Sequence, residues 1–429
     1  MSWFSQSSNS SKDVPNFYPV TSYLSGFGEL SSADTAWANT SNKGFQTETQ
    51  IWYTVLEDGT WVMVQLIWSY VGIFLVPATT QMTFKVYNPN TKQSTWRSIN
   101  ASGAKFDKQN LKTDQFEIRH TGSPKTEESY HITANLDKGV TLDLTFTRPA
   151  NAPGFKFGQG AQGGISTFGK DRDESKRDGF VVHRFHPLAQ SSGTIKIDEK
   201  PLDARGEGMF VHAIQGMRPN LVASRWNFAF FTTSPGAEDP KLGSVRAVQM
   251  EFETTDDYGP KGAKSGRTKV NIGAVYSTKA SENSVLTVTG QTHSPASSPD
   301  AYPASLTGSI SSATHKQAIK DKETGYAVPS SIEFQWSAPK EGSGSEKSIV
   351  TAKVTQDVAG AIVGEGGLIE KVDVLAEIPY VIRKGLAAVT GTKPYIYQYH
   401  NPATFNVEVD GETTAVKGYL FNEASFVSE

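Results

Sequence analysis

Alternation of apolar and polar side chains with a period of two constrains this chain more than any other feature. In the stretch VTLDLTFT, residues 140–147, the four apolar side chains point to one face of an expected strand and the Thr and Asp side chains to the other. Similar short runs recur from residue 46 onward, and turn residues such as Glu57-Asp58-Gly59 separate them. This pattern predicts an all-β fold, and closing the sheets into antiparallel barrels removes exposed strand edges.

Length and composition limit the number of domains and the classes of partner. A chain of 429 residues exceeds one ordinary core, so two domains of about 200 residues each are expected. We expect a polar leader with a short amphipathic segment at 1–45, then domains at 46–222 and 223–429. The 41 basic and 44 acidic residues give a net charge of −3, which argues against a nucleic-acid partner. The absence of Cys excludes disulfides and thiolate chemistry.

The segment Gly206–Phe231 combines aromatic and hydrogen-bonding side chains on two expected strands. Its polar candidates for a site are His212, Gln215, Arg225 and Asn227. One interpretation is a hydrogen-bonded strut at the junction of the barrels, with Arg225 paired to a carboxylate such as that of Glu207. The other is a set of groups that binds the amide or hydroxyl of a ligand at the bottom of an apolar pocket.

Large aromatic side chains on the expected strands complete the candidate ligand cavity. An eight-stranded barrel leaves an interior just wide enough for one slender hydrophobic ligand. The aromatic candidates are Trp52, Trp61, Phe84, Trp96, Trp226 and Trp336.

Other motifs do not support a catalytic or cofactor site. The string Gly158–Gly163 matches the dinucleotide fingerprint, but the charged loop after it provides no helix N-terminus to bind a phosphate. His183 and His186 lie three apart on an expected strand, so their rings would face opposite sides rather than one metal ion. No Gly-x-Ser-x-Gly elbow occurs. We expect no catalytic residue, no metal and no cofactor.

Two segments have helical spacing. Val20, Tyr23, Leu24 and Phe27 form a two-turn apolar stripe, and Trp3 and Phe4 precede it. This stripe could lie in a membrane interface or close a barrel mouth. A second helix is expected at 379–391, packed against a barrel wall or at one barrel end.

Several segments resemble the fungal oxidative-stress survival factors, which have two lipocalin-like barrels. The matching segments are Glu48–Tyr53, Leu56–Thr60, Thr83–Pro89, Val248–Phe252, Val372–Tyr380, Gly391–Tyr399 and Leu420–Phe426. The resemblance implies a lipid carrier, with ceramide or a similar lipid moved between endoplasmic reticulum and Golgi membranes during stress. It also implies a cytoplasmic protein with transient, peripheral membrane contact. The family carries a longer amphipathic N-terminal helix, from which the Ser-rich residues 1–13 depart.

The alternative hypothesis is an enzyme. Two-barrel lipocalin-like folds also include pericyclases and hydratases that act on a polyene or isoprenoid in a shaped apolar pocket. Such an enzyme needs little beyond the cavity and a hydrogen-bond donor, which His212, Arg225 or Asn227 would provide.

Overall fold

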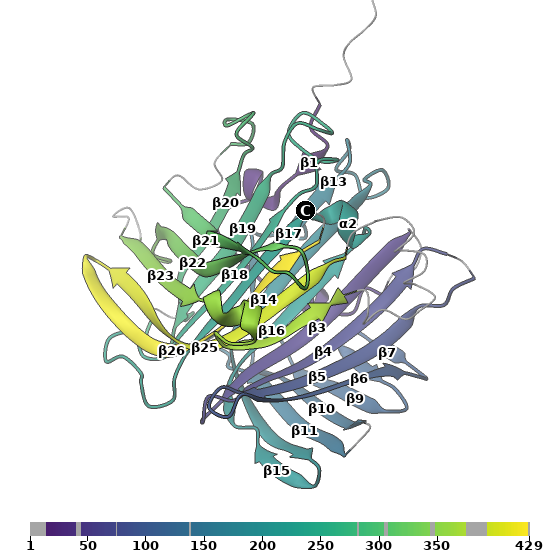
Figure 1. Ribbon diagram of the computed structural model, residues 1–429, viewed down its shortest axis with the longest axis vertical. Coiled ribbons are helices and arrows are strands. Elements are labelled where there is room, and N and C mark those ends of the chain that lie inside the picture. The colour runs from purple at the N-terminus through teal and green to yellow at the C-terminus, as the bar shows by residue number, and fades with distance from the viewer. Residues whose placement is uncertain are drawn as a thin grey trace, which may run out of the picture.

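A computed structural model describes residues 14–39, 44–73, 75–136, 139–280, 283–303, 308–343, 348–374 and 393–427. The described chain is almost entirely β-structure, arranged as two large barrel-like sheets that pack against each other (Figure 1). The prediction of an all-β, two-barrel fold is confirmed. The helix expected at 379–391 lies outside the described residues, as do Trp3 and Phe4.

The first sheet runs in the order β6-β5-β4-β3-β16-β14-β11-β10-β9-β8-β7, and β1, β2, β12, β13 and β15 attach beside this path. Its strands are β1 (Phe17–Tyr18), β2 (Phe27–Glu29), β3 (Phe45–Leu56), β4 (Trp61–Val71), β5 (Thr79–Asn88), β6 (Gln93–Ala101), β7 (Lys105–Asp107), β8 (Asn110–Lys112), β9 (Phe116–Gly122), β10 (Glu128–Leu136), β11 (Val140–Arg148), β12 (Phe155–Phe157), β13 (Ile165–Phe168), β14 (Gly179–Ile197), β15 (Lys200–Asp203) and β16 (Gly206–Gln215).

The second sheet runs in the order β20-β19-β18-β17-β26-β25-β23-β22-β21, with β24 paired to β25. Its strands are β17 (Arg225–Thr233), β18 (Val245–Glu253), β19 (Lys269–Ser277), β20 (Val285–His293), β21 (Ile310–Lys320), β22 (Ala327–Pro339), β23 (Ile349–Asp357), β24 (Leu368–Asp373), β25 (Tyr395–Val409) and β26 (Glu412–Phe426). Short helical turns occur at η1 (Val20–Ser22), α1 (Ser32–Thr35), α2 (Pro219–Val222) and η2 (Ala359–Val363).

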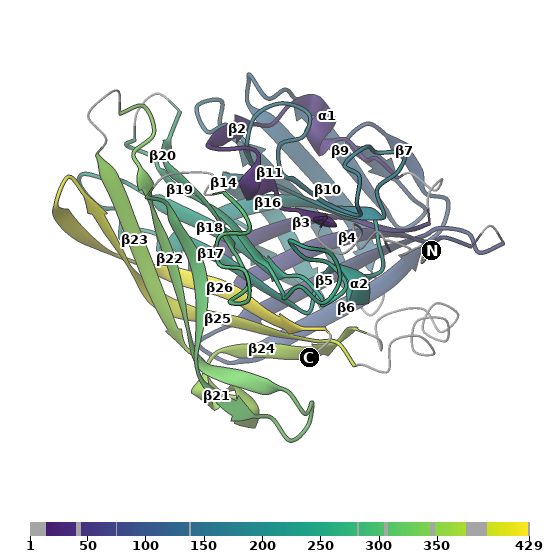
Figure 2. The ribbon, with the colours of Figure 1, turned by 90° about the horizontal axis from the view of Figure 1, so that it is seen from above.

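Neighbouring strands in both sheets pair antiparallel, as meandering hairpins require. The Glu57-Asp58-Gly59 turn joins β3 to β4, as the sequence predicts. The chain passes from the first sheet to the second through α2. Figure 2 shows the two sheets from above, with β21–β26 on one side and β3–β11 on the other.

Strand alternation divides the buried side chains into three cores. One core fills the first barrel between β3–β5 and β9–β11, and a second fills the barrel of the second sheet. The third, the inter-sheet core, lies between the outer faces of β3, β4, β14 and β16 and those of β17–β20 and β26. Because inward and outward residues alternate, the same strands supply a barrel interior and the inter-sheet core. These strands are therefore buried on both faces.

The N-terminal apolar stripe does not form the predicted helix. Val20 lies in the single turn η1, and Phe27 begins strand β2, which pairs with β12. Val20 is buried, and Tyr23, Leu24 and Phe27 pack against the inter-sheet core. Tertiary contacts therefore override the helical spacing, and in this conformation these four side chains face the protein.

Two segments rich in Gly, Ser or Pro contain strands. Residues 294–318, rich in Ser, Pro and Ala, include the first part of β21, and residues 150–179 include β12 and β13. The loop at 158–164 is attached to the protein, because the backbone N–H of Gly158 donates to the carbonyl of Gly26 over 2.9 Å. This position against the N-terminal segment leaves the Gly-rich string without the geometry of a phosphate loop.

Candidate ligand-binding site

The ten side chains predicted to line a ligand cavity lie in different environments and do not form a single site. Some lie in one of the two barrel interiors, some lie in the inter-sheet core, and one lies on the outer surface. The interior of the first barrel contains Trp52, Phe84 and His212. The inward face of the second barrel carries Trp336, Arg225 and Asn227. The inter-sheet core contains Trp61 and Trp226, whereas Gln215 ends β16 and Trp96 is 39% exposed.

His212 is fully buried in the first barrel, and both of its ring nitrogens have partners. Nδ1 lies 2.7 Å from the Asp34 carbonyl and Nε2 lies 2.8 Å from a carboxylate oxygen of Glu48. A backbone carbonyl can only accept, so the ring donates from Nδ1 to Asp34. Glu48 also accepts the backbone N–H groups of Ala38 and Asn39, at 2.8 and 2.6 Å. These bonds fix residues 34–39 to strands β3 and β16.

Asp34 in α1 is the second anchor of this N-terminal segment. Its carboxylate lies 2.7 Å from the Lys156 ammonium and 3.0 Å from the Arg184 guanidinium, and all three side chains are largely buried. Burial alone would raise the pKa of Asp34, but the bonds from Lys156 and Ser31 and the charge of Arg184 outweigh burial and lower that pKa. Residues 31–39 therefore cross one end of the first barrel, where charged side chains of its own strands bind them.

His212 is hydrogen-bonded within the protein, but its partners tie the N-terminal segment to the first barrel, whereas the strut interpretation placed it at the junction of the barrels. Arg225 and Asn227 belong to the second sheet, and Glu207 pairs with Arg246 rather than with Arg225. The polar groups that an enzyme was predicted to use are therefore divided between two barrels. The partners of His212 come from residues 34 and 48, which no spacing in the sequence connects to it.

The second barrel holds its own network of buried amides. Asn227 donates to Glu251 over 3.0 Å, and its side-chain oxygen lies 2.6 Å from the His315 ring. Asn271 donates to Glu251 over 2.9 Å and accepts from Ser311 over 2.6 Å. These groups satisfy one another at one end of the barrel, so they form a structural network in this conformation.

Aromatic rings fill much of both interiors by packing on one another. In the first barrel, Phe210 lies 5.3 Å from Trp52 and 5.0 Å from Tyr130, measured between ring centroids. In the second, Phe405 lies 4.7 Å from Phe231 and 5.4 Å from Trp336. Such contacts stabilise the fold, and a ligand could enter either interior only by displacing some of them.

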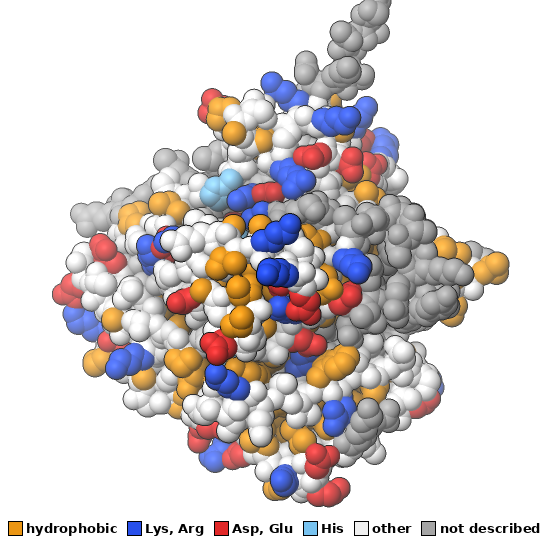
Figure 3. Space-filling view, viewed as in Figure 1, with side chains coloured by type: hydrophobic (Ala, Val, Ile, Leu, Met, Phe, Trp, Pro, Cys, Tyr) orange, Lys and Arg blue, Asp and Glu red, His pale blue; other side chains and the backbone are white. Residues whose placement is uncertain are grey.

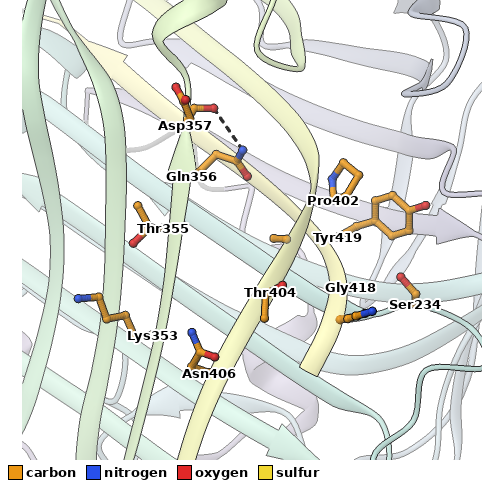
Figure 4. A pocket seen from close by; sticks show the side chains of 12 residues that line it. Ser234, Lys353, Thr355, Gln356, Asp357, Pro402, Thr404, Asn406, Gly418 and Tyr419 are labelled. Carbon is orange, nitrogen blue, oxygen red and sulfur yellow. Dashed lines mark hydrogen bonds between the residues drawn. The ribbon is translucent and has the colours of Figure 1, made fainter. Parts of the chain in front are cut away.

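Two pockets open at the surface of the second sheet. A groove of about 740 Å³ lies where β23 and β25 separate beyond the pair Lys353–Asn406 (Figure 4). Its walls carry mainly polar side chains, including Thr355, Asp357 and Thr404, which offer little surface to an aliphatic chain. The second pocket, of about 360 Å³, reaches Glu251 and Ala313 on the inward side of the barrel. It marks one mouth of the second barrel.

His183 and His186 lie on opposite faces of β14, as strand alternation predicts. His183 packs on Trp226 in the inter-sheet core, and His186 packs on Phe210 inside the first barrel.

Among the described residues no group of three or more His, Asp or Glu is placed to hold a metal. Over the same residues we find no helix long and apolar enough to cross a membrane. Basic and acidic side chains alternate over the face seen in Figure 3.

We expect the protein to lose stability as the pH falls from 7.5 to 5.5. Burial lowers the pKa of His183, His186 and His400 to about 4 and that of His315 to about 3. The unfolded chain takes up these protons near pH 6.5 and the folded chain does not. The free energy of unfolding therefore falls by about 1 kcal/mol for each of these histidines over this interval. Urea unfolding at both pH values measures the change.

The variant His183→Phe retains the ring contact with Trp226 and removes one titrating group, so it should show a shallower pH dependence. Trp226→Phe alters the same ring contact without removing a titrating group, so it is the control and should leave the slope unchanged. Burial raises the pKa of Glu423 and Glu341, so these two carboxyl groups stabilise the folded protein as the pH falls. Their effect opposes that of the four buried histidines, but they are fewer. Equal stability at both pH values would contradict the account of the buried histidines.

Two antiparallel barrels in tandem, with the chain crossing once between them, define a lipocalin-like two-barrel protein. The crystal structure of CghA has this fold, with a TM-score of 0.53 at 10% identity over 96% of this chain and 98% of that one. The model of the Svf1 family matches residues 1–428. The chain belongs to the Svf1 family.

Relatives of nearly equal length support this membership. The chain is 32% identical over 419 residues to the ceramide-binding protein SVF1 of Yarrowia lipolytica, covering 94% of this chain and 91% of the relative. It is 30% identical over 408 residues to the ceramide-binding protein svf1 of Emericella nidulans, covering 94% and 90%. The similarity therefore extends over both sheets.

Proposed function

We propose that this protein binds ceramide or a closely similar lipid and carries it between membranes without chemical conversion. The observation that carries the proposal is the whole-length similarity to relatives that are named as ceramide-binding proteins. Two barrels with apolar cores suit this function, because an aliphatic chain gains about 0.8 kcal/mol for each CH₂ group removed from water. Release is easy only at a membrane, where the lipid finds an equally apolar environment.

The proposal includes a cytoplasmic location, transient contact with endoplasmic reticulum or Golgi membranes, and a contribution to survival of oxidative stress. The resemblance of the sequence to the stress survival factors supports these points. Val20 and Phe27 are available for membrane contact only if the N-terminal segment leaves the inter-sheet core, because both pack there in this conformation.

Titration of the purified protein with a short-chain fluorescent ceramide tests the proposed binding. We expect saturable fluorescence enhancement that unlabelled ceramide reverses. Transfer of the probe from donor to acceptor vesicles should rise in proportion to protein concentration. A linear, non-saturable response equal to that of an unrelated β-barrel protein would contradict the proposal.

A further inference from the structure

The turn between β4 and β5 exposes aliphatic side chains that no described part of the protein covers. Leu75 is 85% exposed and Ile73 is 55% exposed, whereas Val64 in the middle of β4 is fully buried. The hairpin projects from the right-hand edge of the first sheet in Figure 1, and Figure 3 shows hydrophobic side chains at the same edge. We call residues 72–73 and 75–78 the β4–β5 tip.

The sequence around the tip is apolar throughout. Residues 71–78 read VGIFLVPA and contain no charged and no hydrogen-bonding side chain. Surface turns are usually built from polar residues and Gly, as is the turn Glu57-Asp58-Gly59 at the opposite end of β4. Charged residues are absent from the whole stretch 59–84. An apolar patch that belongs to no core and faces water indicates a contact surface.

The tip is an ordered turn. The backbone N–H of Val76 donates to the carbonyl of Ile73 over 2.9 Å, and Pro77 has no N–H to satisfy. Gly72 has a φ of 79°, and a side chain there would meet the backbone of Gly44. The glycine therefore allows the chain to leave β4 close beside the segment that precedes β3. A turn that satisfies part of its own backbone is suited to an apolar medium.

A lipid bilayer is the partner that such a tip fits. A stable protein–protein interface buries about 800 Å² on each partner and includes hydrogen bonds. A narrow turn that offers Ile73, Leu75, Val76 and Pro77 has neither that area nor side-chain donors. A membrane contact requires only a few apolar side chains inserted about 5–10 Å deep, and the lipids adapt to their shape.

We propose that the β4–β5 tip inserts into the interfacial layer of a bilayer and holds the first barrel against the membrane. This inference rests on the proposed function, because a carrier has to contact the membrane at which it exchanges lipid. It gives that contact a surface that is exposed in this conformation, whereas Val20 and Phe27 pack on the inter-sheet core. Because the tip has no charge, its binding should depend little on salt or on anionic lipid.

The absence of Cys makes a site-specific test possible. In Leu75→Cys, an environment-sensitive fluorophore such as NBD is attached to the introduced thiol. On addition of phosphatidylcholine vesicles its emission should rise and shift to shorter wavelength, and a nitroxide on the lipid chains should quench it. Val363→Cys is the matched control, since Val363 in η2 is 73% exposed but belongs to the second sheet. Its label should show neither change.

Vesicle sedimentation of unlabelled variants measures the contribution of the tip. Leu75→Ser should bind phosphatidylcholine vesicles about tenfold more weakly than the wild type, because it removes one inserted leucine side chain. Val363→Ser is the control and should bind as the wild type does. Both residues are exposed, so neither substitution should change the thermal midpoint. The affinity of Leu75→Ser for short-chain ceramide without vesicles should also be unchanged.

The possible failures are distinguishable. Vesicle binding by the wild type, with an unresponsive label at position 75 and full affinity in Leu75→Ser, would overturn the tip and leave the proposed function in place. A dimer of the wild type that Leu75→Ser dissociates in sedimentation velocity runs without lipid would assign the tip to a second copy of the chain and overturn the proposal. Absence of vesicle binding would overturn the tip, and ceramide titration would still test the proposed function separately.

Discussion

Replacing Asp34 by Asn is expected to lower the free energy of unfolding by about 3–5 kcal/mol, the effect typical of breaking a buried ion pair. The substitution keeps the size of the side chain and removes the negative charge between Lys156 and Arg184, whose nitrogens lie 2.7 and 3.0 Å from the carboxylate. Lys156 and Arg184 would stay largely buried and lose the carboxylate that contacts them, and only Arg184 keeps a weaker attraction, to Glu48. Urea denaturation at pH 7.5 measures the loss.

The exposed residue Asp143 supplies the control for this variant. Its carboxylate pairs with His131 at the surface of the first barrel, and solvent screens the pair. Asp143→Asn should therefore change the stability by less than about 1 kcal/mol. Proteolysis should also cleave the segment around residues 31–39 faster in Asp34→Asn than in Asp143→Asn. Equal stability of the two variants would refute the role given to the buried charges.

The second large effect is expected for Trp61→Ala, which should lower the free energy of unfolding by about 3–5 kcal/mol. Trp61 is fully buried at the start of β4, and its ring stacks on Phe421 of the second sheet with a centroid distance of 4.6 Å. It also lies 6.0 Å from the Tyr53 ring. Removing the indole leaves a cavity between the two sheets, so the cost combines lost burial with lost packing.

Trp96→Ala is the matched control for this substitution. Trp96 lies on β6 at the surface, with the Lys85 ammonium 6.0 Å from its ring, and its removal should cost less than about 1 kcal/mol. Thermal unfolding of both variants measures the difference. If the two sheets unfolded in separate transitions in the wild type, with Trp61→Ala affecting neither, the inter-sheet core would not stabilise the protein as described.

Sequence patterns predict the local β-structure well because strand alternation is a local property. The alternation at 140–147 appears as strand β11, and the turn at Glu57-Asp58-Gly59 appears between β3 and β4. The helix predicted from Val20 to Phe27 was wrong, because the spacing fits a helix but the side chains pack on distant strands. Spacing alone does not distinguish a helix from an irregular segment bound by tertiary contacts.

The candidate site was harder to predict, since it depends on contacts distant in sequence. The partners of His212 lie 164 and 178 residues away from it.

Native mass spectrometry of the protein incubated with unlabelled long-chain ceramide tests the central claim most directly. The account predicts a complex of one chain with one ceramide that survives addition of excess diacylglycerol. Spectra that show only the lipid-free chain at saturating ceramide, under conditions in which a known lipid carrier retains its ligand, would contradict it.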